Sequence, residues 1–173
     1  MKKIACLSAV AACALAVTAG TAFAAAGDST ISAGYAMGDF QGVVNKADGF
    51  NLKYRYELDD QLGVIGSYTY LKQSGSGNDL YDKAQYNGFT VGPTYRINDW
   101  ASVYGVIGLG YGRFTGSQQN SSNDHTDTGY GFSYGTGLQF NPIHQIALDI
   151  GYEKSRIRDV TVGAWNIGVG YRF

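Results

Sequence analysis

The last thirteen residues of the chain, 161–173, alternate between bulky and small or polar side chains with the two-residue period of a β-strand. One face of this strand would carry Thr161, Trp165, Ile167, Val169, Tyr171 and Phe173. The opposite face would carry Ala164, Asn166, Gly168, Gly170 and Arg172, which are too small and too polar to build a core. A strand that is apolar outside, polar inside and ends in Phe predicts a transmembrane β-barrel of a bacterial outer membrane. At ~3.3 Å per residue and ~40° tilt, Trp165 and Phe173 would lie roughly 20 Å apart along the membrane normal, near the two interfaces.

The amino-terminal segment 1–24 has the pattern of a secretory signal peptide. Lys2 and Lys3 precede an apolar run, and the small residues of Ala22-Phe23-Ala24 predict cleavage after Ala24. The mature domain would be 25–173, without either of the two cysteines, which excludes a disulfide scaffold and a thiol nucleophile. Its mild acidic surplus argues against nucleic-acid binding.

Seven earlier segments show the same period, so we expect eight strands, an even number. The segment 50–57 is the clearest, since Phe50, Leu52, Tyr54 and Tyr56 alternate with Asn51, Lys53, Arg55 and Glu57. The expected strands are 30–37, 50–57, 62–70, 89–97, 100–114, 130–140, 146–153 and 161–173. In 100–114 the many glycines leave the parity open, and we favour Val103, Ile107, Leu109 and Tyr111 outward with Tyr104 in the lumen.

The connections between these segments alternate in length. Tight turns are expected at Asp59-Asp60, Asn98-Asp99 and Asn141-Pro142, and long polar loops at 38–48, 72–83 and 115–128. Short turns face the periplasm and long loops the exterior, so both termini should be periplasmic. The predicted fold is an all-β, eight-stranded antiparallel up-and-down transmembrane β-barrel, which we expect to be monomeric.

The inner faces of the expected strands carry charges of both signs. Eight strands enclose only enough room for side chains, so these groups should form a polar plug of paired charges. The alternative is an ion or proton path, and hence a small ion channel. The expected interior network is Asn51, Lys53, Arg55, Glu57, Arg96, Gln139, Asp149, Glu153, Asn166 and Arg172.

Three basic residues, Lys154, Arg156 and Arg158, share parity with lipid-facing positions. A basic residue there costs ~2–4 kcal/mol at the bilayer midplane, so they should lie above the hydrocarbon. They could contact the phosphates of lipopolysaccharide, or they could form a solvated extension of the strand.

Segments 100–114 and 145–158 are longer than the membrane requires, which predicts a sheet rising above the surface. An extended segment of another protein could add to its edge as a further strand. Host surface or serum proteins are the expected outside partners, through loops 38–48, 72–83 and 115–128. The loop residues that would add side-chain preference are Asp39, Phe40, Val43, Val44, Leu80 and Tyr81.

An enzymatic interpretation would have to use His125 with Asp124 and Asp127, or nearby serines. The other histidine, His144, lies beside a periplasmic turn, a full strand away, so the two cannot share a site. We therefore expect no catalysis, metal or cofactor, with a membrane-embedded lipid-modifying enzyme as the alternative. A soluble ligand-binding barrel would require apolar residues inside, against the parity of Lys53 and Arg55.

Four segments, 49–57, 92–99, 131–142 and 168–173, resemble the OmpX/Ail/PagC/Lom family of small enterobacterial outer-membrane proteins. The resemblance covers the whole chain. It implies an eight-stranded barrel without a pore or known catalysis. It also implies a protruding sheet associated in some members with adhesion, host-cell entry and complement evasion.

Overall fold

The computed structural model of the protein describes residues 26–41, 44–74, 83–116, 125–157 and 160–173. Eight strands account for nearly all of them, as the alternation of apolar and polar residues predicts. The strands are β1 (Ser29–Gln41), β2 (Val44–Glu57), β3 (Leu62–Ser74), β4 (Lys83–Asn98), β5 (Ala101–Gly116), β6 (His125–Ile143), β7 (Ile146–Ile157) and β8 (Val160–Arg172). None of the described residues belongs to a helix long and apolar enough to span a membrane.

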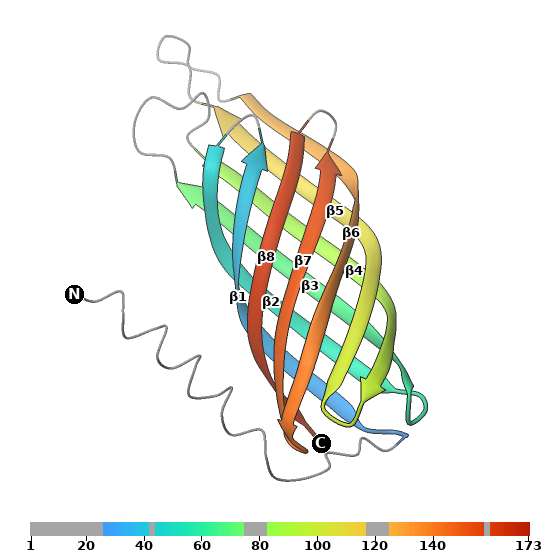
Figure 1. The fold of residues 1–173 in the computed structure, drawn as a ribbon. Helices are drawn as coiled ribbons and strands as arrows, with labels where there is room; N and C mark the ends of the chain where they lie inside the picture. The colour runs from blue at the N-terminus through green and yellow to red at the C-terminus, as the bar shows by residue number, and fades with distance from the viewer. Residues whose placement is uncertain (1–25, 42–43, 75–82, 117–124, 158–159) are drawn as a thin grey trace, which may run out of the picture.

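Each strand pairs antiparallel with its neighbours in the sequence, and β1 also pairs with β8, so the sheet closes into a barrel of tilted strands (Figure 1). Ser29, the first residue of β1, is joined to Phe173, the last residue of the chain, because each backbone N–H donates to the carbonyl of the other, at 2.9 and 2.8 Å. Closure leaves no sheet edge within the membrane, where an unpaired backbone group would be costly. The predicted fold class is confirmed.

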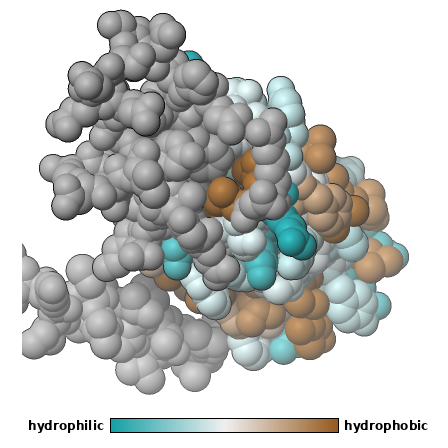
Figure 2. Space-filling model, turned by 90° about the horizontal axis from the view of Figure 1, so that it is seen from above, coloured by the Kyte–Doolittle hydropathy of each residue, from teal (hydrophilic) through white to brown (hydrophobic). Residues whose placement is uncertain are grey.

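Burial follows the expected parity. Apolar side chains that face outward remain exposed, for example Phe89 and Leu109 at 64%, because no protein covers them. Seen from the end opposite the chain's carboxyl terminus, brown apolar side chains lie among pale and teal ones on the coloured part of the outer wall (Figure 2). A soluble protein would not leave such a belt uncovered, whereas hydrocarbon solvates it.

One expected turn is wrong. Asn141 and Pro142 belong to β6, which continues to Ile143, and the turn lies at His144 and Gln145. The register of β6 against β7 is irregular between Phe140 and Ile143, so the strand accommodates Pro142 without ending. An irregularity of this kind leaves a residue out of the ladder, which suits proline.

The bounds of the long connections also need correction. β1 and β2 take up nearly all of the expected loop 38–48 and leave only 42–43 between them. The other two loops shrink to 75–82 and 117–124. The polar residues at these strand ends resemble a loop in sequence, but at least one neighbouring strand pairs with them, on one described side only at 125–128 of β6.

The protruding strands differ from those predicted. β7 has 12 residues and is not overlong, whereas β4 and β5 have 16 each and β6 has 19. The part of the sheet that extends farthest is therefore formed by β4–β6: β5 and β6 are long as predicted, whereas β4 takes the place of the expected β7.

Several predictions concern residues or side chains outside the described part of the chain. The signal peptide and its cleavage after Ala24 are among them, as are Arg158 and the possible metal or catalytic group around His125. The expected loop residues Val43, Leu80 and Tyr81 and the side chains of Phe40 and Val44 also belong to this group.

Candidate functional site

The lumen contains all ten polar residues expected there, and none is more than 7% exposed. They project inward from β2, β4, β6, β7 and β8, because alternate residues of each strand face the barrel axis. Buried polar groups need partners, and the side chains here form three clusters that satisfy most of them, with Arg172 outside the clusters.

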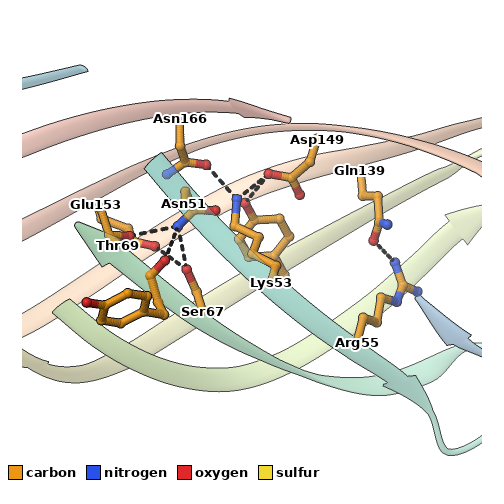
Figure 3. Close-up of polar contacts among 11 residues, drawn as sticks. Asn51, Lys53, Arg55, Ser67, Thr69, Gln139, Asp149, Glu153 and Asn166 are labelled. Carbon is orange, nitrogen blue, oxygen red and sulfur yellow. Dashed lines mark hydrogen bonds and ion pairs between the residues drawn. The ribbon is translucent and has the colours of Figure 1, made fainter. Parts of the chain in front are cut away.

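Lys53 is the centre of one cluster. Its ammonium forms a buried ion pair with Asp149 and donates to Asn166 Oδ1 at 2.5 Å, so β2, β7 and β8 meet across the lumen (Figure 3). The hydroxyl of Tyr104 also donates to Asp149 Oδ1, at 3.1 Å, and the tyrosine ring lies 5.3 Å from the Lys53 nitrogen. The charge of Lys53 is thus compensated locally.

Glu153 is held differently, by neutral donors. Ser67 Oγ donates to one carboxylate oxygen at 2.9 Å and Thr69 Oγ1 to the other at 2.7 Å. Asn51 Nδ2 in turn donates to both hydroxyl oxygens, at 2.8 and 2.7 Å, which aims the hydroxyl protons at the carboxylate (Figure 3). No ion pair of Glu153 occurs among the described residues.

Glu57 forms the third cluster, with two arginines. Its Oε1 lies 2.8 Å from an Nη2 nitrogen of both Arg55 and Arg96. Arg55 Nη1 also donates to Gln139 Oε1 at 2.7 Å, across the lumen to β6. Arg172 is equally buried, at 1% exposure, but its three guanidinium nitrogens have no hydrogen-bond partner among the described residues.

Tyr104 settles the parity of β5, because it is 3% exposed and points into the lumen. Val103, Ile107, Leu109 and Tyr111 face outward. The ring requires glycine opposite it: a Cβ on Gly137 or Gly151 would come within 2.2 or 2.4 Å of the Tyr104 hydroxyl oxygen. Glycines of β6 and β7 therefore make room for the interior tyrosine of β5.

An apolar layer inside the barrel was not expected from the sequence. Its members are buried side chains on the inner faces of β1–β4, β7 and β8, toward the end with the longer connections. They are Ala36, Ala47, Leu71, Tyr86, Ile157, Val162 and Ala164, with Val160 packed against them. Two of them follow from the sequence: Leu71 continues the alternation of inward residues in 63–69, and Val162 continues that of 164–172 toward the start of the strand.

Tyr86 links this layer to the polar network. Its hydroxyl lies 3.2 Å from Ser133 Oγ and also bonds Ser155, and all three groups are buried. The lumen of the described barrel is therefore filled in sequence along its axis by arginines, by the Lys53 and Glu153 clusters, and by apolar side chains. Among the described residues, no group of three or more histidine, cysteine or acidic side chains could hold a metal.

The basic residues on the outer wall lie beyond the interfacial tryptophan. Tyr152 pairs with Trp165, and the next two outward positions of β7 are Lys154, facing Gly163, and the exposed Arg156, facing Thr161. Lys72 and Arg113 were not predicted as site residues. They are exposed on either side of Gln85 in adjacent strands, although Lys72 also faces Asp48.

The far end of β6 has described pairing on one side only. Pairing with β5 continues to Gly116 and His125, whereas the described pairing with β7 ends at Gly131 and Ile157. Six residues of β6, 125–130, thus extend past the described end of β7. Such a segment has backbone donors and acceptors that another strand can use.

The closing strand presents its expected residues to the outside. Trp165, Ile167, Val169, Tyr171 and Phe173 are 55, 56, 57, 52 and 66% exposed. They form one continuous stripe along β8, from the ring of Trp165 beside Tyr152 to the last residue of the chain.

Comparison with known proteins agrees with this architecture. A family model described as outer membrane protein β-barrel domain matches residues 4–173. Outer membrane protein X of Escherichia coli K12 is 60% identical over 176 residues, covering all of both chains. The chain belongs to the OmpX/Ail/PagC family. It is a bacterial outer-membrane β-barrel protein, as expected from the exposed belt.

Other members of the OmpX/Ail/PagC family carry names that refer to attachment, invasion or virulence. The attachment invasion locus protein of Yersinia enterocolitica is 39% identical over 182 residues, covering all of both chains. A crystal structure of Ail from Yersinia pestis in complex with the heparin analogue sucrose octasulfate is 38% identical. It has a TM-score of 0.76 and covers 85% of this chain and 99% of that one.

Proposed function

We propose that the protein is a non-enzymatic surface barrel of the outer membrane that offers the free edge of β6 to an extended segment of an outside protein. The observation that carries the proposal is the one-sided pairing of residues 125–130. Strand addition at an edge gives affinity through backbone hydrogen bonds and specificity through alternate side chains. Host surface or serum proteins are the partners we propose, in line with the name of the Yersinia relative.

Proline substitution at neighbouring residues tests the edge. Successive residues of a strand direct their N–H groups to opposite sides of the strand. Of the two variants Thr128→Pro and Gly129→Pro, only one therefore removes an N–H on the free side of β6. We expect that variant to lose binding of serum and cell-surface proteins to the barrel in lipopolysaccharide-containing nanodiscs. The matched control is Thr128→Ala, which keeps the N–H. Unchanged binding in both folded proline variants would contradict the proposal.

We further propose that Lys154 and Arg156 contact the phosphates of lipopolysaccharide in the outer leaflet. They lie just beyond the level of Trp165, where a basic side chain near an anionic surface contributes about 1 kcal/mol. The double variant Lys154→Gln/Arg156→Gln should lose most of the extra thermal stability that lipopolysaccharide gives over neutral phospholipid. Asp60→Asn, at the opposite end of the barrel, is the control and should keep it.

A sulfated polysaccharide is a second candidate ligand, because the Ail structure was solved with a heparin analogue. The exposed pair Lys72 and Arg113 lies above the belt on β3 and β5 and could meet sulfate groups. Lys72→Gln/Arg113→Gln should weaken retention on immobilised heparin more than Lys154→Gln/Arg156→Gln does. Equal retention of both double variants and the unaltered protein would argue against this ligand.

For the closing strand, we propose that the stripe from Trp165 to Phe173 is read by the outer-membrane assembly machinery. Phe173→Ala should slow assembly in cells while folding of the purified protein into vesicles proceeds. Val169→Ala, in the middle of the stripe, is the control for lost apolar surface. If both variants assemble at the same rate in cells, the assembly machinery does not specifically recognise Phe173.

A further inference from the structure

Charge is distributed unevenly along the lumen. Toward the end with the long connections, Lys53 is paired with Asp149, and Glu153 adds a second carboxylate that has hydroxyl partners. Toward the end where Ser29 meets Phe173, the buried charges are Arg55, Arg96 and Arg172 against Glu57. Asp28, which is half-buried, and the terminal carboxylate of the exposed Phe173 lie at the rim, so within the lumen three guanidinium groups face one buried carboxylate.

Most of the guanidinium donors in this half have no partner. Glu57 receives one nitrogen from each of Arg55 and Arg96, and Gln139 receives another from Arg55. Among the described residues nothing accepts from Arg96 Nε and Nη1, from Arg55 Nε, or from any of the three nitrogens of Arg172. Arg172 is 1% exposed, so bulk water does not solvate these groups.

Register brings the unpartnered groups together. Thr30 pairs with Arg172 on one side and with Arg55 on the other, so the two arginines flank it on β8 and β2. Its hydroxyl has no partner, and the same holds for Thr94, two residues before Arg96, and for Ser102, which faces Arg96. The inner wall here thus presents N–H and O–H donors from five strands, β1, β2, β4, β5 and β8.

A buried charge without a counter-charge is costly, and a donor without an acceptor adds to the cost. We propose that this half of the lumen binds a small inorganic anion, a halide or phosphate, held chiefly by Arg172 and Arg96 and bordered by Thr30 and Ser102. A compact anion supplies what the wall lacks, because it accepts several charge-assisted hydrogen bonds at once.

The test follows the arginine side-chain Nε–Hε signals by NMR in the barrel held in lipid nanodiscs. Sodium chloride and sodium phosphate are titrated separately, with sodium gluconate keeping ionic strength constant because its anion is too large to enter a filled lumen. We expect saturable shifts at Arg172 and Arg96 and none at Arg113, which is exposed on the outer wall. The anion that saturates the shifts at the lower concentration is the preferred ligand. Saturation by either anion supports the site.

Two variants assign the site. In Arg172→Gln the half-saturating concentration read at Arg96 should rise about tenfold or more, the usual effect of losing a hydrogen bond to a charged group. Lys53→Gln is the matched control: it removes a lumen cation already paired with Asp149, and the response at Arg172 should persist. A non-saturating drift shared equally by Arg113 in the unaltered protein would overturn the proposal, whether or not the variants fold.

Discussion

The two halves of the lumen are filled by different kinds of side-chain contact. The half in which Ser29 meets Phe173 relies on charge, with Arg55 and Arg96 bonded to Glu57 and with Arg172 buried without a partner among the described residues. The other half contains one buried ion pair, between Lys53 and Asp149, and otherwise relies on hydroxyl donors to Glu153 and, beyond them, on the apolar layer around Leu71 and Tyr86. Charged interiors are strong only when every charge is compensated, whereas neutral packing tolerates the loss of one polar partner better. The two ends should therefore respond differently to equivalent substitutions.

The largest expected effect is at Glu57. Glu57→Gln leaves the buried Arg55 and Arg96 without their common carboxylate, and we expect the free energy of unfolding to fall by about 3–5 kcal/mol. Urea unfolding in lipid vesicles, followed by tryptophan fluorescence, measures this change. Glu153→Gln is the matched substitution in the other half. It should cost only about 1 kcal/mol, because the amide oxygen still accepts a hydroxyl proton. Equal losses of unfolding free energy for Glu57→Gln and Glu153→Gln would contradict the proposed difference between the two halves.

Leu71→Ala should come next, at about 3 kcal/mol, because it opens a cavity in the apolar layer. The same unfolding experiment applies. Leu52→Ala is the control, since Leu52 is 47% exposed on the outer wall and lipid can fill the space that its side chain leaves. A loss no greater at Leu71 than at Leu52 would show that the layer is not closely packed.

Thr69→Val should lower the free energy of unfolding by about 1.5–3 kcal/mol, the usual contribution of a hydrogen bond to a charged group. It removes one of the two hydroxyl donors to Glu153 while keeping the size of the side chain. Combining it with Glu153→Gln gives a double-mutant cycle. If Glu153 is held by Thr69, the two losses will not add.

The smallest effect is expected for Tyr86→Phe, at about 1 kcal/mol, because Ser133 and Ser155 can still bond each other. Heat-modified gel mobility together with urea unfolding would detect it. A loss as large as that of Glu57→Gln would show that this half of the barrel depends on its polar groups as strongly as the arginine-rich half does.

The barrel and most of its side-chain directions could be predicted because a period of two is imposed by lipid on one side and a narrow lumen on the other. Segment 50–57 illustrates this, since every residue has the exposure that its parity predicts. The strand ends were harder. Leu71 and Val162 look like breaks in an apolar-out pattern, because an inward apolar residue is favourable only when an inner layer exists to receive it.

Tertiary pairing explains the other misses. Asn141-Pro142 is a typical turn dipeptide, yet an irregularity of register lets β6 continue through it. Which carboxylate meets which cation across the lumen also could not be predicted, because Lys53 and Asp149 belong to β2 and β7, whose relative height depends on the stagger of the closed barrel.

The double hydrogen bond between Ser29 and Phe173 has a consequence for biogenesis. The first strand to be synthesised can complete its ladder only with the last, so nascent polypeptide carries an open seam until translation and export have finished. Contacts this distant along the chain form slowly, and an unsealed rim is prone to associate with other chains. Periplasmic holding factors would therefore be needed most before the final residues arrive.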